Sequence, residues 1–359
     1  MLSTLRTFLP LARKVHERSK LDVLNHCCIE NGYIRMTDLE TTVRTPIPDD
    51  GSYTIPIQVL YQILKTKPET LSIEALPHPE QIRIRYDDNQ VTCPSFDPEE
   101  YPALDVVDYQ WIGNWSPAIL QTLKEQCQYT SSDELKPALN GIWFRQNGTL
   151  ETCATDGHML QYQPSLISED IQDAEIESTG ILPTKTVKIL ARFAKAPVEV
   201  YAGESSLKFV LADDIEVFVT LINERFPDFK SLLDFGDRSS VTVQREALLS
   251  AVQSAKPFAN KTTHQGVVEI AETAVQLSVE DPETNLAFET EIPLEETNSG
   301  QSQRIGLNLH YFEKLLKPMG PATIRWHYRS GISASLFTDP NQNGESPIGL
   351  LMPIRLEEE

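Results

Sequence analysis

The chain has 359 residues, of which 40% are hydrophobic, and its formal net charge at pH 7 is −21. This length suits two or three domains, and the hydrophobic content excludes wholesale disorder. No stretch approaches the roughly 20 apolar residues of a membrane helix. The net charge, taken alone, argues against nucleic acid as a partner, because acidic surfaces repel phosphate backbones.

The N-terminus and the cysteines indicate a reducing compartment. The charged residues Arg13 and Lys14 interrupt the apolar N-terminal segment, which has no continuous apolar core and no cleavage site. We therefore expect no secretory signal peptide. The cysteine count is odd, and no C-x-x-C spacing occurs, which fits neither a disulfide framework nor a zinc site. We therefore expect buried, reduced thiols, a cytoplasmic location, and neither a metal nor a cofactor. The cysteines are Cys27, Cys28, Cys93, Cys127 and Cys153.

Apolar spacing predicts six amphipathic helices, at 3–18, 56–67, 116–126, 184–195, 245–258 and 308–318. Ser116-Pro117 places an N-cap before a proline at the first helical position, and Asn308 is a second candidate N-cap. Short β-branched or alternating runs between these helices predict strands, for example at 81–86, 198–201, 207–210, 241–243 and 274–279. The sequence therefore indicates an α+β fold.

The order of helix, strands, helix, strands occurs three times, with a period of roughly 120 residues and negligible sequence identity between the copies. This pattern predicts three similar domains, at 1–110, 111–236 and 237–359. The six predicted helices carry 15 of the 31 Lys and Arg residues but only 4 of the 52 Asp and Glu residues. Because Glu favours helices about as well as Lys does, helix propensity does not explain this segregation. An acidic protein with basic helices can present one positive surface to a phosphate backbone.

Several short motifs, in order along the whole chain, resemble those of one family, the bacterial DNA polymerase III β subunit or β sliding clamp. They are Thr37-Asp38-Leu39-Glu40, Glu99-Glu100-Tyr101-Pro102, Leu139-Asn140-Gly141, Ala154-Thr155-Asp156-Gly157-His158, Arg225-Phe226-Pro227-Asp228-Phe229 and Met352-Pro353-Ile354-Arg355-Leu356. The resemblance implies three similar domains per chain and a two-chain, head-to-tail ring. In such a ring, helices line the hole and sheets form the outside. It also implies a processivity factor that encircles duplex DNA without reading its sequence and tethers DNA polymerase III and other replication and repair proteins.

The resemblance further implies a pocket between the second and third domains, where the polymerase and the clamp loader insert short linear peptide motifs. Apolar walls, a flexible methionine and few polar groups suit such a site. For Leu139, Leu160 and Leu232, an ordinary place in the core remains the alternative. The residues implied are Leu139, Thr155, Gly157, His158, Met159, Leu160, Pro227, Ser231, Leu232, His264, Asn308, Tyr311, Ile332, Ala334, Leu350, Leu351, Met352, Pro353, Ile354 and Arg355.

Two positions of this pocket depart from the family pattern. Met159 and Ser231 stand where arginine is usual or common in the family, so the pocket rim loses positive charge. We therefore expect its preferred peptide to depend less on acidic residues.

The resemblance and the charge pattern together suggest a DNA-facing surface. Its candidates are Arg6, Arg13, Lys14, Arg18, Lys20, Lys65, Lys124, Lys185, Lys188, Arg192, Lys195, Arg245 and Lys314. A dimer edge is implied at Val91 and Cys93 of one chain and Phe258 of the other. There, Asp87-Asp88-Asn89-Gln90 replaces the basic residues that the family often has, which alters the charge complement of the homodimer.

The sequence leaves two other functions to consider, an enzyme and a protein-binding scaffold. Asp156-Gly157-His158 could be imagined as an acid/base or metal site, but no H-x-x-x-H, H-E-x-x-H, G-x-S-x-G or phosphate-binding loop supports an enzyme. We expect a non-catalytic accessory subunit. The remaining alternative is a clamp-like scaffold that binds replication proteins but does not encircle DNA, and the altered dimer edge keeps it open.

Overall fold

A computed structural model describes residues 1–16, 19–76, 80–104, 107–166, 177–296, 302–341 and 346–356. The chain divides into two compact units. The first comprises Met1–Gln121, Gln146–Gly148 and Ser168–Asn223, and the second comprises Thr122–Arg145, Thr149–Ile167 and Glu224–Glu359. The middle third of the chain thus contributes to both units, and the division into three domains stays a prediction.

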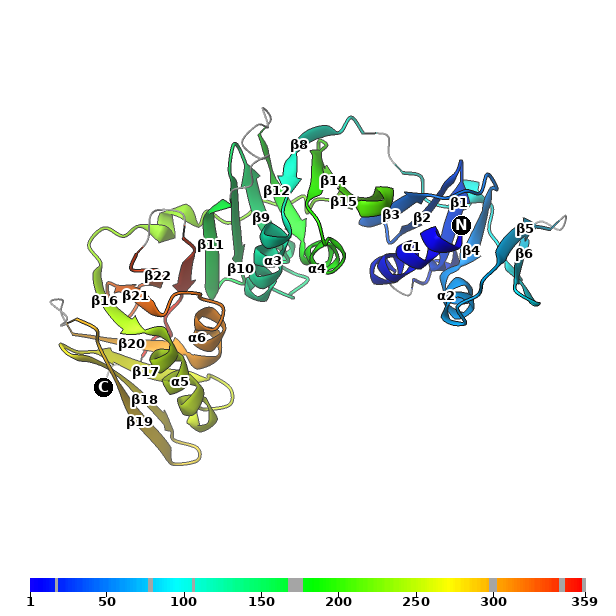
Figure 1. The fold of residues 1–359 in the computed structure, drawn as a ribbon. Helices are drawn as coiled ribbons and strands as arrows, with labels where there is room; N and C mark the ends of the chain where they lie inside the picture. Colours follow the sequence, from blue (N-terminus) through cyan, green and yellow to red (C-terminus); the bar gives the residue numbers. More distant parts are fainter. Residues whose placement is uncertain are drawn as a thin grey trace. The chain divides into compact units, whose positions relative to one another are not determined.

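The described residues form six α-helices, and each corresponds to a predicted one (Figure 1). In the first helix Leu5 and Phe8 are fully buried, whereas Arg13 and Lys14 are exposed, so the predicted amphipathic pattern is confirmed. The helices are α1 (Leu2–Val15), α2 (Ile57–Lys65), α3 (Pro117–Gln126), α4 (Thr184–Phe193), α5 (Arg245–Ala255) and α6 (Leu309–Leu316).

An eight-stranded antiparallel sheet runs through the first unit, and α1 packs against it. Its order is β4 (Tyr53–Pro56), β1 (His26–Glu30), β2 (Tyr33–Thr37), β3 (Thr41–Pro46), β15 (Ile215–Thr220), β14 (Ser206–Leu211), β13 (Val198–Ala202) and β8 (Gln110–Trp115). A smaller sheet contains β5 (Leu71–Ala75), β6 (Gln81–Tyr86) and β7 (Asn89–Pro94). A further strand, β12 (Ser178–Pro183), leads directly into α4.

The second unit repeats this scheme. One antiparallel sheet contains, in order, β9 (Gly141–Gln146), β10 (Leu150–Thr155), β11 (Met159–Leu166), β23 (Ile348–Leu351), β22 (Ser335–Thr338), β21 (Thr323–Tyr328) and β16 (Ser239–Gln244). A four-stranded sheet contains β19 (Leu286–Pro293), β18 (Ala274–Asp281), β17 (Gln265–Ile270) and β20 (Gln303–Asn308). Helices α5 and α6 pack against each other.

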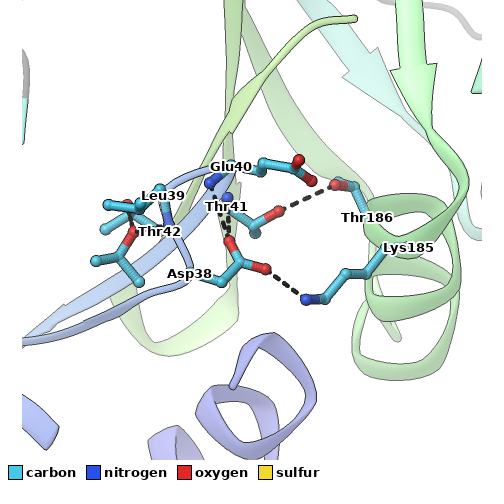
Figure 2. Close-up of polar contacts among 8 residues, drawn as sticks. Asp38, Leu39, Glu40, Thr41, Thr42, Lys185 and Thr186 are labelled. Carbon is cyan, nitrogen blue, oxygen red and sulfur yellow. Dashed lines mark hydrogen bonds and ion pairs between the residues drawn. The ribbon is translucent and has the colours of Figure 1, made fainter. Parts of the chain in front are cut away.

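The turn between β2 and β3 is fixed to the start of α4 (Figure 2). Asp38 Oδ1 accepts hydrogen bonds from the backbone N–H groups of Glu40, at 3.0 Å, and Thr41, at 2.6 Å, while Asp38 Oδ2 pairs with the ammonium of Lys185. The hydroxyls of Thr41 and Thr186 lie 3.3 Å apart. These contacts join segments almost 150 positions apart within the first unit.

Cys27, Cys28, Cys93 and Cys153 are buried and Cys127 is half-buried, so the expected burial is confirmed for four of the five cysteines. Burial raises the pKa of the Cys93 thiol to about 11, which keeps this thiol protonated at neutral pH. In the part of the chain that the structure describes, no helix is long and apolar enough to cross a membrane.

Candidate functional site

The Ala154–His158 motif forms the tight turn between β10 and β11. Asp156 Oδ1 accepts hydrogen bonds from the backbone N–H groups of His158, at 2.8 Å, and Met159, at 2.9 Å. The Thr155 hydroxyl donates to the Met159 carbonyl at 2.7 Å and accepts from the Gly157 N–H at 3.0 Å. Gly157 has a φ of 92°, a conformation that glycine adopts without strain. The motif therefore encodes a turn, and Asp156 holds that turn together.

The C-terminal motif lies beside this turn. Strand β11 pairs antiparallel with β23, with Met159 opposite Leu351 and Leu160 opposite Leu350. The backbone N–H of Met352 donates to the His158 carbonyl at 2.8 Å. Two segments almost two hundred positions apart in sequence thus form adjacent parts of one surface in the second unit.

The segment 225–233, in the second unit, supplies the wall that faces this turn. Phe229 is buried and packs on Trp143 of β9 and Tyr162 of β11, with centroid distances of 5.3 Å in both cases. This anchor positions a short 3-10 turn, Lys230–Leu233, whose Leu232 side chain is 43% exposed. An exposed leucine beside a cavity is available to an incoming apolar side chain.

These three segments, together with Leu139 of the 3-10 turn Pro137–Leu139, line a cavity of about 120 Å³. Half of the residues predicted for the peptide pocket line it, and two lining residues, Asp228 and Phe229, were not predicted although both belong to the Arg225–Phe229 motif. The lining consists of Leu139, Thr155, Gly157, His158, Met159, Leu160, Pro227, Asp228, Phe229, Leu232, Leu350 and Met352.

Helix α6 lies close to the rim. The ring of His158 stacks on Tyr311, with centroids 5.3 Å apart and planes 15° apart. Asn308 caps α6, since its Oδ1 accepts from the N–H groups of His310 and Tyr311. His264 contacts α6 through its carbonyl, which accepts from the Leu309 N–H at 2.9 Å, and through its ring, whose centroid lies 5.3 Å from that of His310. Burial, followed by the nearby Asp156 carboxylate, raises the pKa of Tyr311, so its hydroxyl stays protonated and can donate.

The other predicted pocket residues lie outside the cavity lining. Ala334 and Leu351 are buried in the core, so their place in the fold is structural. Ile332 is 73% exposed. Ser231 and Arg355 are exposed, and Pro353 and Ile354 are half-buried.

The cavity carries little positive charge. Its described lining includes no Lys or Arg, and Asp228 is its carboxylate. Lys230, the adjacent cation, pairs instead with Glu151 at 2.8 Å. Although burial opposes ionisation, hydrogen bonds from Lys230 and Tyr162 hold the pKa of Glu151 below its ordinary value. The cavity is therefore suited to apolar, uncharged groups.

The predicted DNA-facing cations divide into two groups. Arg18 lies outside the described residues. Lys185 is held by Asp38, and Arg245 is half-buried and pairs with Glu246 while donating to the Pro321 carbonyl at 3.2 Å. The others are exposed: Arg6, Arg13, Lys14, Lys20, Lys65, Lys124, Lys188, Arg192, Lys195 and Lys314.

The predicted dimer-edge residues lie at two sheet edges. Val91 is half-buried and Cys93 is buried on β7, the last strand of its three-stranded sheet in the order described. Phe258 stacks on Phe288 of β19, itself an outer strand, with centroids 5.4 Å apart. In the turn before β7, Asp87 accepts from the N–H groups of Glu69 and Thr70, so this acidic residue also holds a loop in place.

No protein-family model matches the chain. A curated relative, the beta sliding clamp of Vibrio cholerae serotype O1, is 24% identical over 356 residues and covers 94% of this chain and 94% of its own length. The crystal structure of a DNA polymerase sliding clamp from Bacillus subtilis superposes with a TM-score of 0.85 at 20% identity, over 99% of this chain and 98% of that one. The DNA polymerase III subunit beta of Pseudomonas aeruginosa gives 0.85 at 22% identity, with the same coverage. The chain thus has the sliding-clamp fold over its whole length, and the resemblance noted in the sequence is confirmed.

Proposed function

We propose that this chain is a β sliding clamp, the processivity factor that tethers DNA polymerase III and other replication and repair proteins to duplex DNA. The observation that carries the proposal is whole-length similarity of fold and of relatives, with 99% of the chain covered by a solved clamp structure. A non-encircling scaffold is the weaker candidate, because a solved sliding clamp covers 99% of the chain with a TM-score of 0.85.

The proposed assembly is a two-chain, head-to-tail ring, each chain contributing three similar domains at 1–110, 111–236 and 237–359. The outer strands β7 and β19 support this arrangement, since unpaired strand edges are ready templates for pairing with a second chain. In a head-to-tail contact the two edges differ, so each chain offers one of each, and the ring closes when the curvature fits.

Duplex DNA is the proposed cargo of the ring. The ten exposed cations on or beside the helices support sequence-independent contacts with phosphates, which position a duplex without reading its bases. Weak contacts suffice in a closed ring, because its topology prevents dissociation and leaves the protein free to slide.

The proposed partner site is the cavity beside β11 and β23. Short linear motifs of the polymerase and the clamp loader would place apolar side chains among Leu160, Leu232 and Met352. The protein itself would have no catalytic role, since Asp156 is engaged in holding its turn. We also propose a cytoplasmic location, which the odd number of cysteines and the lack of a C-x-x-C spacing support.

The number of chains in the particle, and its shape in solution, test the proposed ring. Sedimentation and electron microscopy are expected to give a two-chain ring with a central hole. Phe258→Asp should shift the protein toward single chains, because it places a charge at the proposed edge. Phe235→Asp, at another half-exposed phenylalanine, is the matched control and should leave the ring intact. Single chains at all concentrations would support the non-encircling scaffold instead.

A further inference from the structure

A second cavity, of about 260 Å³, lies in the first unit between α1 and α2. Helices α1 and α2 contact each other (Figure 1), and residues of both line the cavity. Its lining consists of Arg6, Leu9, Pro10, Arg13, Tyr61, Leu64 and Lys65. This combination of three cations, one aromatic ring and apolar side chains differs from the largely apolar lining of the peptide cavity.

The cavity contains a planar stack. The guanidinium carbon of Arg13 lies 3.6 Å from the centroid of the Tyr61 ring, so the two flat groups are in direct contact. Arg6 donates from Nη2 to the carbonyl of Pro68 at 2.7 Å, which restrains its charged end. Leu9, only 4% exposed, supplies an apolar floor. The site therefore offers a flat surface beside fixed positive charge.

The cations of this cavity, Arg6, Arg13 and Lys65, have no ion-pair partner among the described residues. The chain as a whole nevertheless carries a net charge of −21. Its volume falls just below the roughly 300–1,000 Å³ of pockets that enclose drug-sized ligands. A ligand that fits must be anionic, flat and small.

We propose that this cavity binds an unpaired nucleotide of single-stranded DNA, with the base against the Arg13–Tyr61 stack and the backbone phosphates near Arg6 and Lys65. Proteins that hold single strands combine a cationic groove with aromatic or guanidinium platforms on which bases stack. A base within a duplex is already stacked on its neighbours and cannot enter such a cavity. The proposal thus goes beyond duplex encirclement and does not require a closed ring.

The test uses the full chain, unloaded, and a fluorescently labelled single strand of eight thymidines at low salt. A second strand of equal length and charge carries abasic residues in place of the thymines. We expect the thymidine strand to bind more tightly, because only it carries bases. Tyr61→Ala should weaken its binding about five- to 150-fold, the range found for losing a stacked base, whereas Tyr61→Phe should retain it.

Arg13→Ala and Arg192→Ala form a matched pair. Each removes one exposed helical arginine whose guanidinium lies over an aromatic ring. Arg192 is absent from the lining of this cavity. Both variants should weaken duplex binding similarly, but only Arg13→Ala should abolish the preference for the thymidine strand over the abasic strand.

Equal binding of the two strands by the wild-type chain would overturn the proposal. So would unchanged binding by a folded Tyr61→Ala variant, or an acidic peptide that binds the cavity more tightly than the thymidine strand. If the chain formed no ring but still preferred the thymidine strand, the proposed clamp function would fail while this proposal would stand.

Discussion

Asp38, in the turn after β2, forms an ion pair with Lys185 at the first turn of α4 (Figure 2). The two side chains are 11% and 26% exposed. A lysine at a helix N-terminus faces the positive end of the helix dipole, and the Asp38 carboxylate offsets that repulsion. The pair therefore stabilises both the turn and the start of the helix, which explains why Lys185 differs from its exposed neighbours on α4.

Neutralising Asp38 should lower the stability of the first unit. Asp38→Asn keeps an oxygen for the N–H groups of Glu40 and Thr41 but removes the charge that holds Lys185. We expect the free energy of unfolding to fall by about 1–3 kcal/mol, measured by denaturant titration. Glu40→Gln, an equal charge change at an exposed position of the same turn, should stay within about 0.5 kcal/mol of wild type. Equal losses in both variants would contradict a specific role for the pair.

Truncating Met352 should weaken binding of a partner peptide. Met352 is 37% exposed and lines the peptide cavity, so Met352→Ala removes contact surface without opening the core. We expect a loss of about fivefold or more in affinity, measured by calorimetry with a peptide that carries apolar anchors. Ile332→Ala is the matched control, because Ile332 is exposed but outside the lining, and it should leave affinity unchanged. If Ile332→Ala weakened binding more than Met352→Ala, the peptide would bind near Ile332 and not in the cavity.

The peptide cavity should discriminate little in favour of acidic peptides. We expect two peptides that differ only by Asp in place of Asn to bind the wild-type chain within about threefold, because no described lining residue is a cation. Ser231→Arg restores a cation at an exposed rim position and should favour the acidic peptide, more at low salt than at high salt. A strong wild-type preference for the acidic peptide would contradict this expectation.

His327 should make stability depend on pH. Burial, followed by Arg325 and Arg238, lowers the pKa of His327 from 6.5 to about 4, so its imidazole is neutral in the folded state at pH 6. Between these values the unfolded chain holds more protons, and stability therefore falls as the pH decreases from 6.5 toward 4. Because the ring is partly exposed, we expect a loss of about 1–2 kcal/mol rather than the full amount. His327→Gln should show a shallower decline over this interval, and identical pH profiles would exclude the effect.

The helices and many strands could be predicted from the sequence because burial there follows a local period. Most predicted helices extended too far at their C-terminal ends, for physical reasons that act within one turn, whereas the helix predicted at 116–126 ends at Gln126 as expected. The Thr66 hydroxyl donates to the Ile63 carbonyl at 2.7 Å and closes α2. Pro257 lies in the 3-10 turn Lys256–Phe258 that follows α5, where its missing N–H is tolerated.

The candidate site could be predicted only in part. Pairing of Leu160 with Leu350 joins strands from distant parts of the chain, and no local pattern encodes it. The resemblance to the family placed both segments in one pocket and supplied ten of the twelve residues that line the cavity. Asp228 was missed although its motif had been recognised, since a motif does not say which of its side chains face inward. The Arg13–Tyr61 stack depends on how α1 packs near α2, which spacing within either helix does not determine.

Release from cut DNA tests the central claim most directly. The chain is loaded by its clamp loader onto a nicked circular duplex, washed at moderate salt, and the circle is then cut once. We predict that the protein stays on the intact circle, leaves promptly when the circle becomes linear, and stays again when bulky proteins block both ends. Retention on the cut DNA with free ends, or no retention on the circle, would contradict topological encirclement and favour the scaffold.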